Sequence, residues 1–194
     1  MTLTQAAFGT DTLLKKALLV LGGSALIAVA AQISVPFFPV PLTMQTLAIL
    51  FVGLSFGSRL GAATVIAYLV EGAAGLPVFA NGSFGLLPLV GPTAGFLFGF
   101  IAMAYVAGLA AERSKSVVVM AGGALLASAL LYIPGVAWPM FGAELFAIEG
   151  KWVGSSASSI WTYWVSPFLL GDAVKAVIAA LLVAGGMKAF SKEA

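Results

Sequence analysis

The stretch Phe168–Met187, FLLGDAVKAVIAALLVAGGM, decides the fold class of this chain. It is long and apolar enough for a helix that crosses a bilayer, which takes ~20 residues. The other apolar stretches predict helices near Leu13–Ala31, Leu42–Phe56, Leu60–Gly75, Thr93–Ala111 and Val117–Tyr132. The sequence therefore predicts an all-α integral membrane bundle of six transmembrane helices, with residues 1–194 as a single transmembrane domain.

Composition supports a membrane protein. Hydrophobic residues make up 61% of the chain and charged residues 8%, and the mean hydropathy is +1.11. Soluble domains carry roughly 25% charged residues. A water-soluble chain with this composition would have too few polar side chains to cover its surface, and the length leaves no room for a separate soluble domain.

Two segments between the predicted spans are apolar yet rich in proline and glycine: QISVPFFPVP at 32–41 and LPVFANGSFGLLPLVGP at 76–92. Irregular backbone at membrane depth is stable only where protein or a watered cavity satisfies its polar groups. We therefore expect ordered loops that dip into the protein, and we look there first for a binding site.

The distribution of basic residues predicts the topology. They fall at the N-terminus, the second and fourth breaks and the C-terminus, all on one side of a six-helix arrangement: Lys15, Lys16, Arg59, Arg113, Lys115, Lys188 and Lys192. Lys151, in the fifth connection, is the exception. Because cytoplasmic loops carry an excess of Lys and Arg, we predict that both termini are cytoplasmic.

Several functional classes are excluded by what the sequence lacks. The basic residues are too scattered for nucleic acid. The chain has no cysteine and no histidine, which excludes disulfides, thiolate or Ser-His catalysis and the usual metal ligands. No P-loop motif occurs, and no paired carboxylates lie within the predicted spans. We therefore predict no catalytic residue, no metal site and no enzymatic activity.

Asp172 and Lys175 are the strongest candidates for a binding role. Ionisable residues within a span are expensive and usually face a bundle interior or a cavity, and their i,i+3 spacing places both on one helix face. The alternative is structural: Asp172 caps the helix and Lys175 pairs with it or snorkels outward.

Three further polar residues are candidate ligand contacts. Asn81, in the third loop, offers an amide donor and acceptor, although a turn residue with left-handed geometry is the alternative. Gln45 and Tyr68 lie in predicted spans and are expected to reach a central cavity, with interhelical hydrogen bonding as the alternative. Glu71 lies near a helix end, where snorkelling is the simpler interpretation.

Small residues suggest close helix contacts. Gly91, Gly95 and Gly99 form a tandem G-x-x-x-G series, which packing within the bundle explains best. In the first predicted span, Ser24 and Ala28 form a small-x-x-x-small pair, which fits packing within the bundle and packing against a partner subunit equally well. The four tryptophans before the last span suggest an aromatic belt, with one or two available to cover an apolar ligand.

Four runs resemble one known family. They are VPFFPVPLTMQT (35–46), GLPVF (75–79), GPTAGFLFGF (91–100) and PFLLGDAVKA (167–176), in the family's order and spacing. Together they are similar to the BioY family, the biotin-binding S components of energy-coupling factor transporters. The resemblance implies a multi-pass protein of the bacterial plasma (inner) membrane whose outward-facing loops enclose one biotin.

The resemblance also implies partners and site residues. The partners are a transmembrane coupling protein and two ATPase subunits, which fits the missing P-loop. In the family the Asn of the third loop and the Asp and Lys of G-D-x-x-K contact the vitamin; here these are Asn81, Asp172 and Lys175. Two departures remain: the first helix only approximates the usual Ala-x-x-x-Ala pattern, and the connection Gly135–Ser166 looks long and polar.

The sequence thus predicts a high-affinity biotin-binding subunit of an ATP-driven importer, with no cofactor and biotin as the transported ligand. A stand-alone transporter or channel for biotin or another small acid is the alternative, and a membrane enzyme acting on lipids is disfavoured. Biotin has ureido N–H donors at one end and a carboxylate at the other. We therefore expect Asp172 to accept from the ureido group and Lys175 to neutralise the tail carboxylate.

Overall fold

A computed structural model of the chain describes residues 2–8 and 12–190, and it is almost entirely helical. A two-stranded antiparallel ladder pairs Ser34 with Thr43 and Val35 with Leu42. The elements in chain order are α1 (Leu3–Phe8), α2 (Leu13–Gln32), β1 (Ser34–Val35), β2 (Leu42–Thr43), α3 (Gln45–Phe56), α4 (Ser58–Ala73), the 3-10 turn η1 (Ala80–Gly82), α5 (Leu87–Val90), α6 (Ala94–Arg113), α7 (Val117–Ala137), the π-helical η2 (Trp138–Gly142), α8 (Ala143–Leu145), α9 (Ala157–Ile160), the π-helical η3 (Trp161–Val165) and α10 (Ser166–Phe190).

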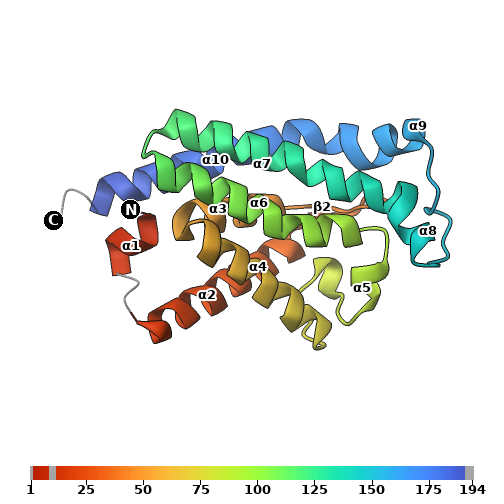
Figure 1. The fold of residues 1–194 in the computed structure, drawn as a ribbon, viewed down its shortest axis with the longest axis horizontal. Helices are drawn as coiled ribbons and strands as arrows, with labels where there is room; N and C mark the ends of the chain where they lie inside the picture. Colours follow the sequence, from red (N-terminus) through yellow and green to blue (C-terminus); the bar gives the residue numbers. More distant parts are fainter. Residues whose placement is uncertain (1, 9–11, 191–194) are drawn as a thin grey trace.

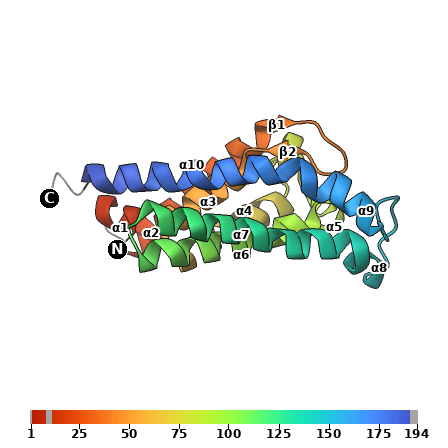
Figure 2. The ribbon, with the colours of Figure 1, turned by 90° about the horizontal axis from the view of Figure 1, so that it is seen from above.

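Helix α6 occupies the centre of the bundle. It packs against α7, α3 and α4, while α10 lies along α7 and α3, and α2 packs on the outer side of α4 (Figure 1). Seen from above, α10 runs along one side of the molecule and α6 and α7 along the other (Figure 2). The buried side chains of all these helices form one apolar core.

Small residues let the central helices approach closely. A Cβ at Gly95 would collide with the Pro134 carbonyl, and one at Gly99 would meet Leu131 and Pro134 at 2.8 Å. Both glycines therefore face α7, as expected for packing within the bundle. Gly91 belongs to the same series in sequence but precedes the helix, where it is the C-cap residue of α5.

Four helical stretches among the described residues are long and apolar enough to cross a membrane: Leu13–Gln32, Ala94–Arg113, Val117–Leu145 and Ala157–Phe190. Helices α3 and α4 fill the other two predicted ranges but have only 12 and 16 residues. At 1.5 Å per residue they are about 18 and 24 Å long, less than the ~30 Å of a bilayer core. The membrane-protein class is supported, whereas the count of six full spans is not confirmed.

The outer surface of the bundle is apolar, as a lipid-facing surface requires. Large hydrophobic side chains are exposed along the outer faces of the long helices, including Leu18 and Val29 on α2, Leu126 and Ile133 on α7, and Leu170 and Leu181 on α10.

The predicted span Leu42–Phe56 begins too early. Residues 42–43 pair with residues 34–35, so the helix starts only at Gln45. The loop 32–41 is therefore a short hairpin rather than irregular backbone throughout. Pro41 precedes the second strand, and its fixed φ and missing N–H suit an extended segment better than a helix interior.

The connection Gly135–Ser166 is much more helical than predicted. Helix α7 continues past Tyr132 through Pro134 and passes via η2 into α8, while α9 and η3 lead directly into α10. Proline lacks the N–H that an interior helical position donates, and the wider π turn of η2 begins near the second proline, Pro139. Only residues 146–156 lie outside helices.

The two ends of the bundle differ. Helix α1 and the C-terminal end of α10 lie at one end, and α5, α8 and α9 lie at the other (Figures 1 and 2). Arg59, near the start of α4, and Arg113, at the end of α6, belong to the breaks predicted to be cytoplasmic. Lys192, part of the same prediction, lies outside the described residues.

Candidate functional site

A cavity of about 500 Å³ opens between the hairpin, the loop around η1 and the helices α6, α7 and α10. This volume falls within the ~300–1,000 Å³ of typical small-molecule sites. The two proline- and glycine-rich segments singled out in the sequence both contribute to its wall. Val40 and Pro41 come from the first segment, and residues that include Phe79, Asn81 and Pro88 come from the second.

Most of the cavity wall is apolar and aromatic. Phe79, Phe96, Phe100, Leu131 and Phe168 line it. Phe96 packs edge-on against the ring of Tyr132, with ring centroids 6.1 Å apart. A wall of this kind suits an apolar ring system and leaves recognition to a small number of polar groups.

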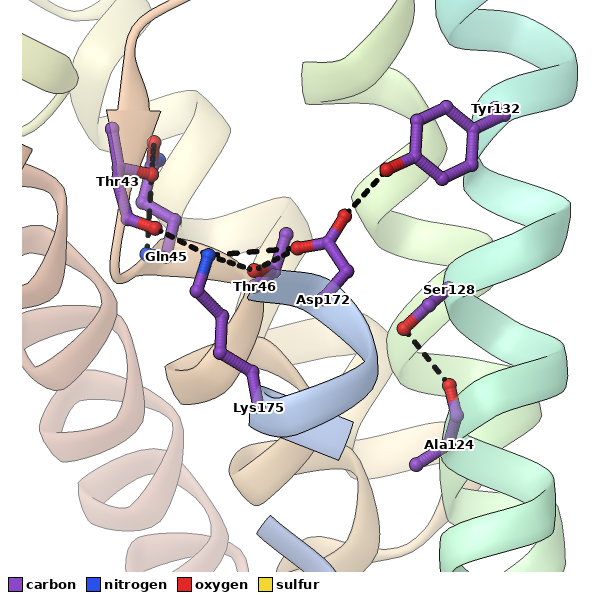
Figure 3. Close-up of polar contacts among 8 residues, drawn as sticks. All are labelled: Thr43, Gln45, Thr46, Ala124, Ser128, Tyr132, Asp172 and Lys175. Carbon is purple, nitrogen blue, oxygen red and sulfur yellow. Dashed lines mark hydrogen bonds and ion pairs between the residues drawn. The ribbon is translucent and has the colours of Figure 1, made fainter. Parts of the chain in front are cut away.

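The polar groups gather around Asp172, which is 5% exposed and lines the cavity. The Tyr132 hydroxyl donates to Asp172 Oδ2 at 2.7 Å, and the Thr46 hydroxyl donates to Oδ1 at 2.9 Å (Figure 3). Lys175 Nζ lies 3.5 Å from Oδ1. We call Thr43, Thr46, Tyr132, Asp172 and Lys175 the polar cluster.

Lys175 is held by three acceptors. Its Nζ donates to the Thr43 backbone oxygen at 2.8 Å, to Thr46 Oγ1 at 3.1 Å and to Asp172 Oδ1 at 3.5 Å. An ammonium group has three N–H donors and no acceptor. The hydrogen bonds therefore account for its full donor capacity without a ligand, and they tie α10 to the end of β2 and the start of α3.

Asp172 and Lys175, which are expected to bind opposite ends of biotin, lie next to each other in the cavity wall. At 3.5 Å the two groups form one ion pair at one place in the cavity wall, whereas the ureido group and carboxylate of biotin are separated by its ring system and valerate chain. The helix-cap alternative also fails for Asp172. Helix α10 begins at Ser166 and is continuous with η3, so Asp172 is an interior helical residue.

Gln45 lines the cavity, and Tyr68 stands behind it. Gln45 Nε2 donates to the Tyr68 hydroxyl at 2.8 Å, and that hydroxyl donates to the Val78 backbone oxygen at 3.1 Å. The Thr43 hydroxyl donates to Gln45 Oε1 at 3.1 Å. Tyr68 is 0% exposed and is not among the residues of the cavity wall. The structure thus brings Gln45 to the cavity and gives Tyr68 one interhelical hydrogen bond, with Gln45 of α3, and one hydrogen bond to the loop after α4.

Asn81 combines both interpretations of its sequence position. Its backbone has φ 59° and ψ 30°, the left-handed conformation of a turn residue, and its side chain also lines the cavity. The Ser34 hydroxyl donates to its Oδ1 at 2.9 Å. The side chain of Gln32 anchors the same loop, accepting from Gly82 N at 2.9 Å and donating to the Phe79 backbone oxygen at 3.1 Å.

Ser24 and Ala28, the predicted contacts with a partner subunit, do not line the cavity. Ser24 is 2% exposed, and its hydroxyl donates to Glu71 Oε1 at 2.9 Å. Ala28 is half-buried and packs against the core. Ser24 is thus committed to α4, as packing within the bundle requires, and Glu71 is engaged by a neighbouring helix rather than only snorkelling.

Sequence reasoning missed several residues of the site. Thr43 and Thr46 flank Gln45 within the run 35–46, and their proximity to Gln45 was the available signal. Nothing in the sequence pointed to Tyr132, because its contact with Asp172 depends on α7 lying beside α10. From the long connection, Trp152 and Glu149 line the cavity, so one of the four tryptophans is available to cover a ligand.

Comparisons with known proteins agree with this architecture. The model of the BioY family matches residues 3–192. The chain belongs to the BioY family. It is 38% identical over 159 residues to the biotin transporter BioY of Thermotoga maritima, covering 82% of this chain and 88% of the relative. It is 33% identical to the probable biotin transporter BioY of Pyrococcus horikoshii, covering 81% and 87%.

A solved structure shares the fold of this BioY-family chain. The S-component for biotin from an ECF-type ABC transporter superposes with a TM-score of 0.74 at 23% identity, covering 90% of this chain and 92% of that one. The resemblance noted in the sequence is thereby confirmed. The relatives are transporters, in agreement with the prediction that the protein is not an enzyme.

Proposed function

We propose that this BioY-family protein is the high-affinity biotin-binding S component of an energy-coupling factor importer. The observation that carries the proposal is the cavity, in which the polar cluster lies beside aromatic and aliphatic walls. Biotin has the complementary chemistry: a planar ureido group, an apolar thioether ring and a flexible acid tail. The assignment to a family of biotin transporters independently supports the same ligand.

The ureido group is the part of biotin that fits the polar cluster. Its N–H groups suit the Asp172 carboxylate, and a hydrogen bond to a charged acceptor is worth more than a neutral one. Its carbonyl suits an amide donor, which Gln45 and Asn81 offer from other parts of the wall. The thioether ring would then pack against the phenylalanines.

Lys175 has a supporting role in this proposal. Because its three donors are used by Thr43, Thr46 and Asp172, it holds the carboxylate in place. It contributes to binding through Asp172, and the tail carboxylate of biotin is recognised elsewhere. Tyr68 contributes in the same indirect way by orienting Gln45.

The proposed membrane arrangement keeps the predicted six-helix bundle in the plasma membrane. Helices α3 and α4 complete the six although they are short, because protein covers much of their surface. Eight of the twelve residues of α3 are buried. The end with α5, α8 and α9 faces outward, and both termini are cytoplasmic.

Transport is proposed to require a coupling protein and two ATPase subunits. The absence of a P-loop motif supports this division. Of the two residues of α2 predicted to contact a partner subunit, Ala28 is the better candidate, because the hydroxyl of Ser24 is bonded to Glu71. A stand-alone transporter for biotin or another small acid remains the second candidate, since partner dependence is not encoded in the cavity.

Two measurements test the proposal. Purified protein in detergent should bind radiolabelled biotin without ATP or other proteins, and unlabelled biotin should compete whereas a straight-chain fatty acid should not. Absence of saturable binding would contradict the proposed ligand. Affinity purification from native membranes should recover ATPase subunits; biotin uptake by vesicles containing this chain alone would favour the stand-alone alternative.

A further inference from the structure

Within the polar cluster, the Asp172 carboxylate keeps one hydrogen-bond acceptor position open. A carboxylate accepts about four hydrogen bonds, roughly two on each oxygen. Oδ1 accepts from Thr46 at 2.9 Å and is paired with Lys175 at 3.5 Å, whereas Oδ2 accepts from Tyr132 at 2.7 Å. Among the described residues, no second hydrogen-bond donor reaches Oδ2.

Tyr132 is placed to orient that open position. Its hydroxyl comes from α7 and meets the carboxylate of α10 across the cavity wall that both residues line (Figure 3). Its ring is fixed by edge-on packing against Phe96. With Oδ1 held from the α3 side and Oδ2 from the α7 side, the carboxylate has little freedom to rotate.

We propose that Tyr132 is a positioning residue for ligand selection, and that Asp172 accepts a ureido N–H of biotin at Oδ2 rather than at Oδ1. The inference rests on the proposed function and specifies the chemistry at that site. The two N–H bonds of the five-membered ureido ring point to opposite sides, so one carboxylate can accept from only one of them with good geometry. Oδ1 is already occupied by Thr46 and Lys175, so Oδ2 is the oxygen with an acceptor position left for this contact.

The test uses biotin and its two mono-N-methyl isomers, each blocking one ureido nitrogen, with the purified wild-type protein. The isomer that blocks the contact with Oδ2 should bind at least about tenfold more weakly than biotin, the scale of a lost hydrogen bond to a charged group. The other isomer should lose much less. Equal losses for the two isomers, or no loss for either, would overturn the single-contact geometry.

Tyr132→Phe then separates positioning from a general structural role. The variant should bind biotin at least about tenfold more weakly, with no further loss for the isomer that already lacks the critical N–H. The same fold-loss for all three ligands, or none for biotin, would contradict the positioning role. Because the isomer comparison uses the wild type, it remains decisive even if this variant does not fold.

Ser128→Ala is the matched control. Ser128 lies one turn before Tyr132 on α7, and its hydroxyl donates to the Ala124 backbone oxygen at 2.9 Å within the same helix (Figure 3). It is 5% exposed and does not line the cavity. Removing this hydroxyl should leave the affinities for all three ligands unchanged. Failure of the wild type to bind biotin at all would instead reject the proposed function.

Discussion

Two carboxylates with well-formed hydrogen bonds have different surroundings in this molecule. Asp172 accepts from Tyr132 and Thr46 on separate helices and lines the cavity. Glu112, near the end of α6 closest to α1, accepts from Ser58 N at 2.7 Å and from Ser58 Oγ at 2.9 Å. Glu112 thus satisfies one free backbone N–H at the start of α4, as a capping group does.

The difference shows that hydrogen bonding alone does not identify a binding residue. Glu112 is bonded to a single neighbouring residue at a helix start, and it is exposed and not part of the cavity wall. Asp172 is buried, is held by side chains from three helices and retains an open acceptor beside an apolar wall. The first arrangement stabilises a fold, and the second is prepared for a ligand.

The largest expected effect is on Asp172. Asp172→Asn should weaken biotin binding by about 1.5–3 kcal/mol, because the charged acceptor becomes a neutral amide. Equilibrium binding of radiolabelled biotin measures this loss, and thermal unfolding in detergent checks that the variant is folded. Wild-type affinity in a folded variant would remove Asp172 from the proposed site.

The Glu112 variant provides the opposite pattern. Glu112→Ala should lower stability by about 0.5–2 kcal/mol through loss of the cap on α4, while biotin affinity stays at the wild-type value. Thermal unfolding and binding are measured on the same preparation. A binding loss comparable to that of Asp172→Asn would abolish the distinction between the two carboxylates.

Lys175 sharpens the comparison within the polar cluster. Lys175→Met keeps the apolar stem but releases Thr43, Thr46 and Asp172, so binding should weaken by about 1–3 kcal/mol. Because the ammonium acts through Asp172, the penalty should be the same for biotin and biotin amide. A loss of affinity for biotin but not for the amide would show that Lys175 binds the tail carboxylate.

Asn81 should show the smallest binding effect, about 1 kcal/mol, because the residue is exposed. Asn81→Gly is the appropriate variant, since glycine tolerates the φ of 59° that alanine would resist. The affinity for biotin is compared with that of Gly82→Ala, which strains the same turn at φ 68° but leaves the amide. Unchanged biotin affinity in Asn81→Gly would show that Asn81 serves only as a turn residue.

The features that could be predicted from the sequence are those set by local composition. Hydropathy located helices in all six predicted ranges, and the cost of charge in a span identified Asp172 and Lys175. The sequence did not reveal that Leu42 and Thr43 form a strand, or that α7 continues through Pro134. The strand depends on a short hairpin that pairs these residues with Val35 and Ser34, and the segment around Pro134 packs closely against Gly95 of α6.

The same reason explains what was missed in the site. Tyr132 lies 40 residues from Asp172 in sequence and contacts it only because α7 and α10 pack side by side. The i,i+3 spacing places Asp172 and Lys175 on one helix face, but it does not show which other groups contact the Lys175 ammonium. The backbone oxygen of Thr43 does so from the hairpin.

A crystal structure of the protein with biotin bound tests the central claim most directly. The account predicts one ureido nitrogen at about 2.9 Å from Asp172 Oδ2, with Tyr132 still bonded to that oxygen and Lys175 still bonded to Thr43. The thioether ring should lie against Phe96 and the other aromatic side chains of the wall. Biotin bound with its carboxylate on Lys175, or outside this cavity, would contradict the account.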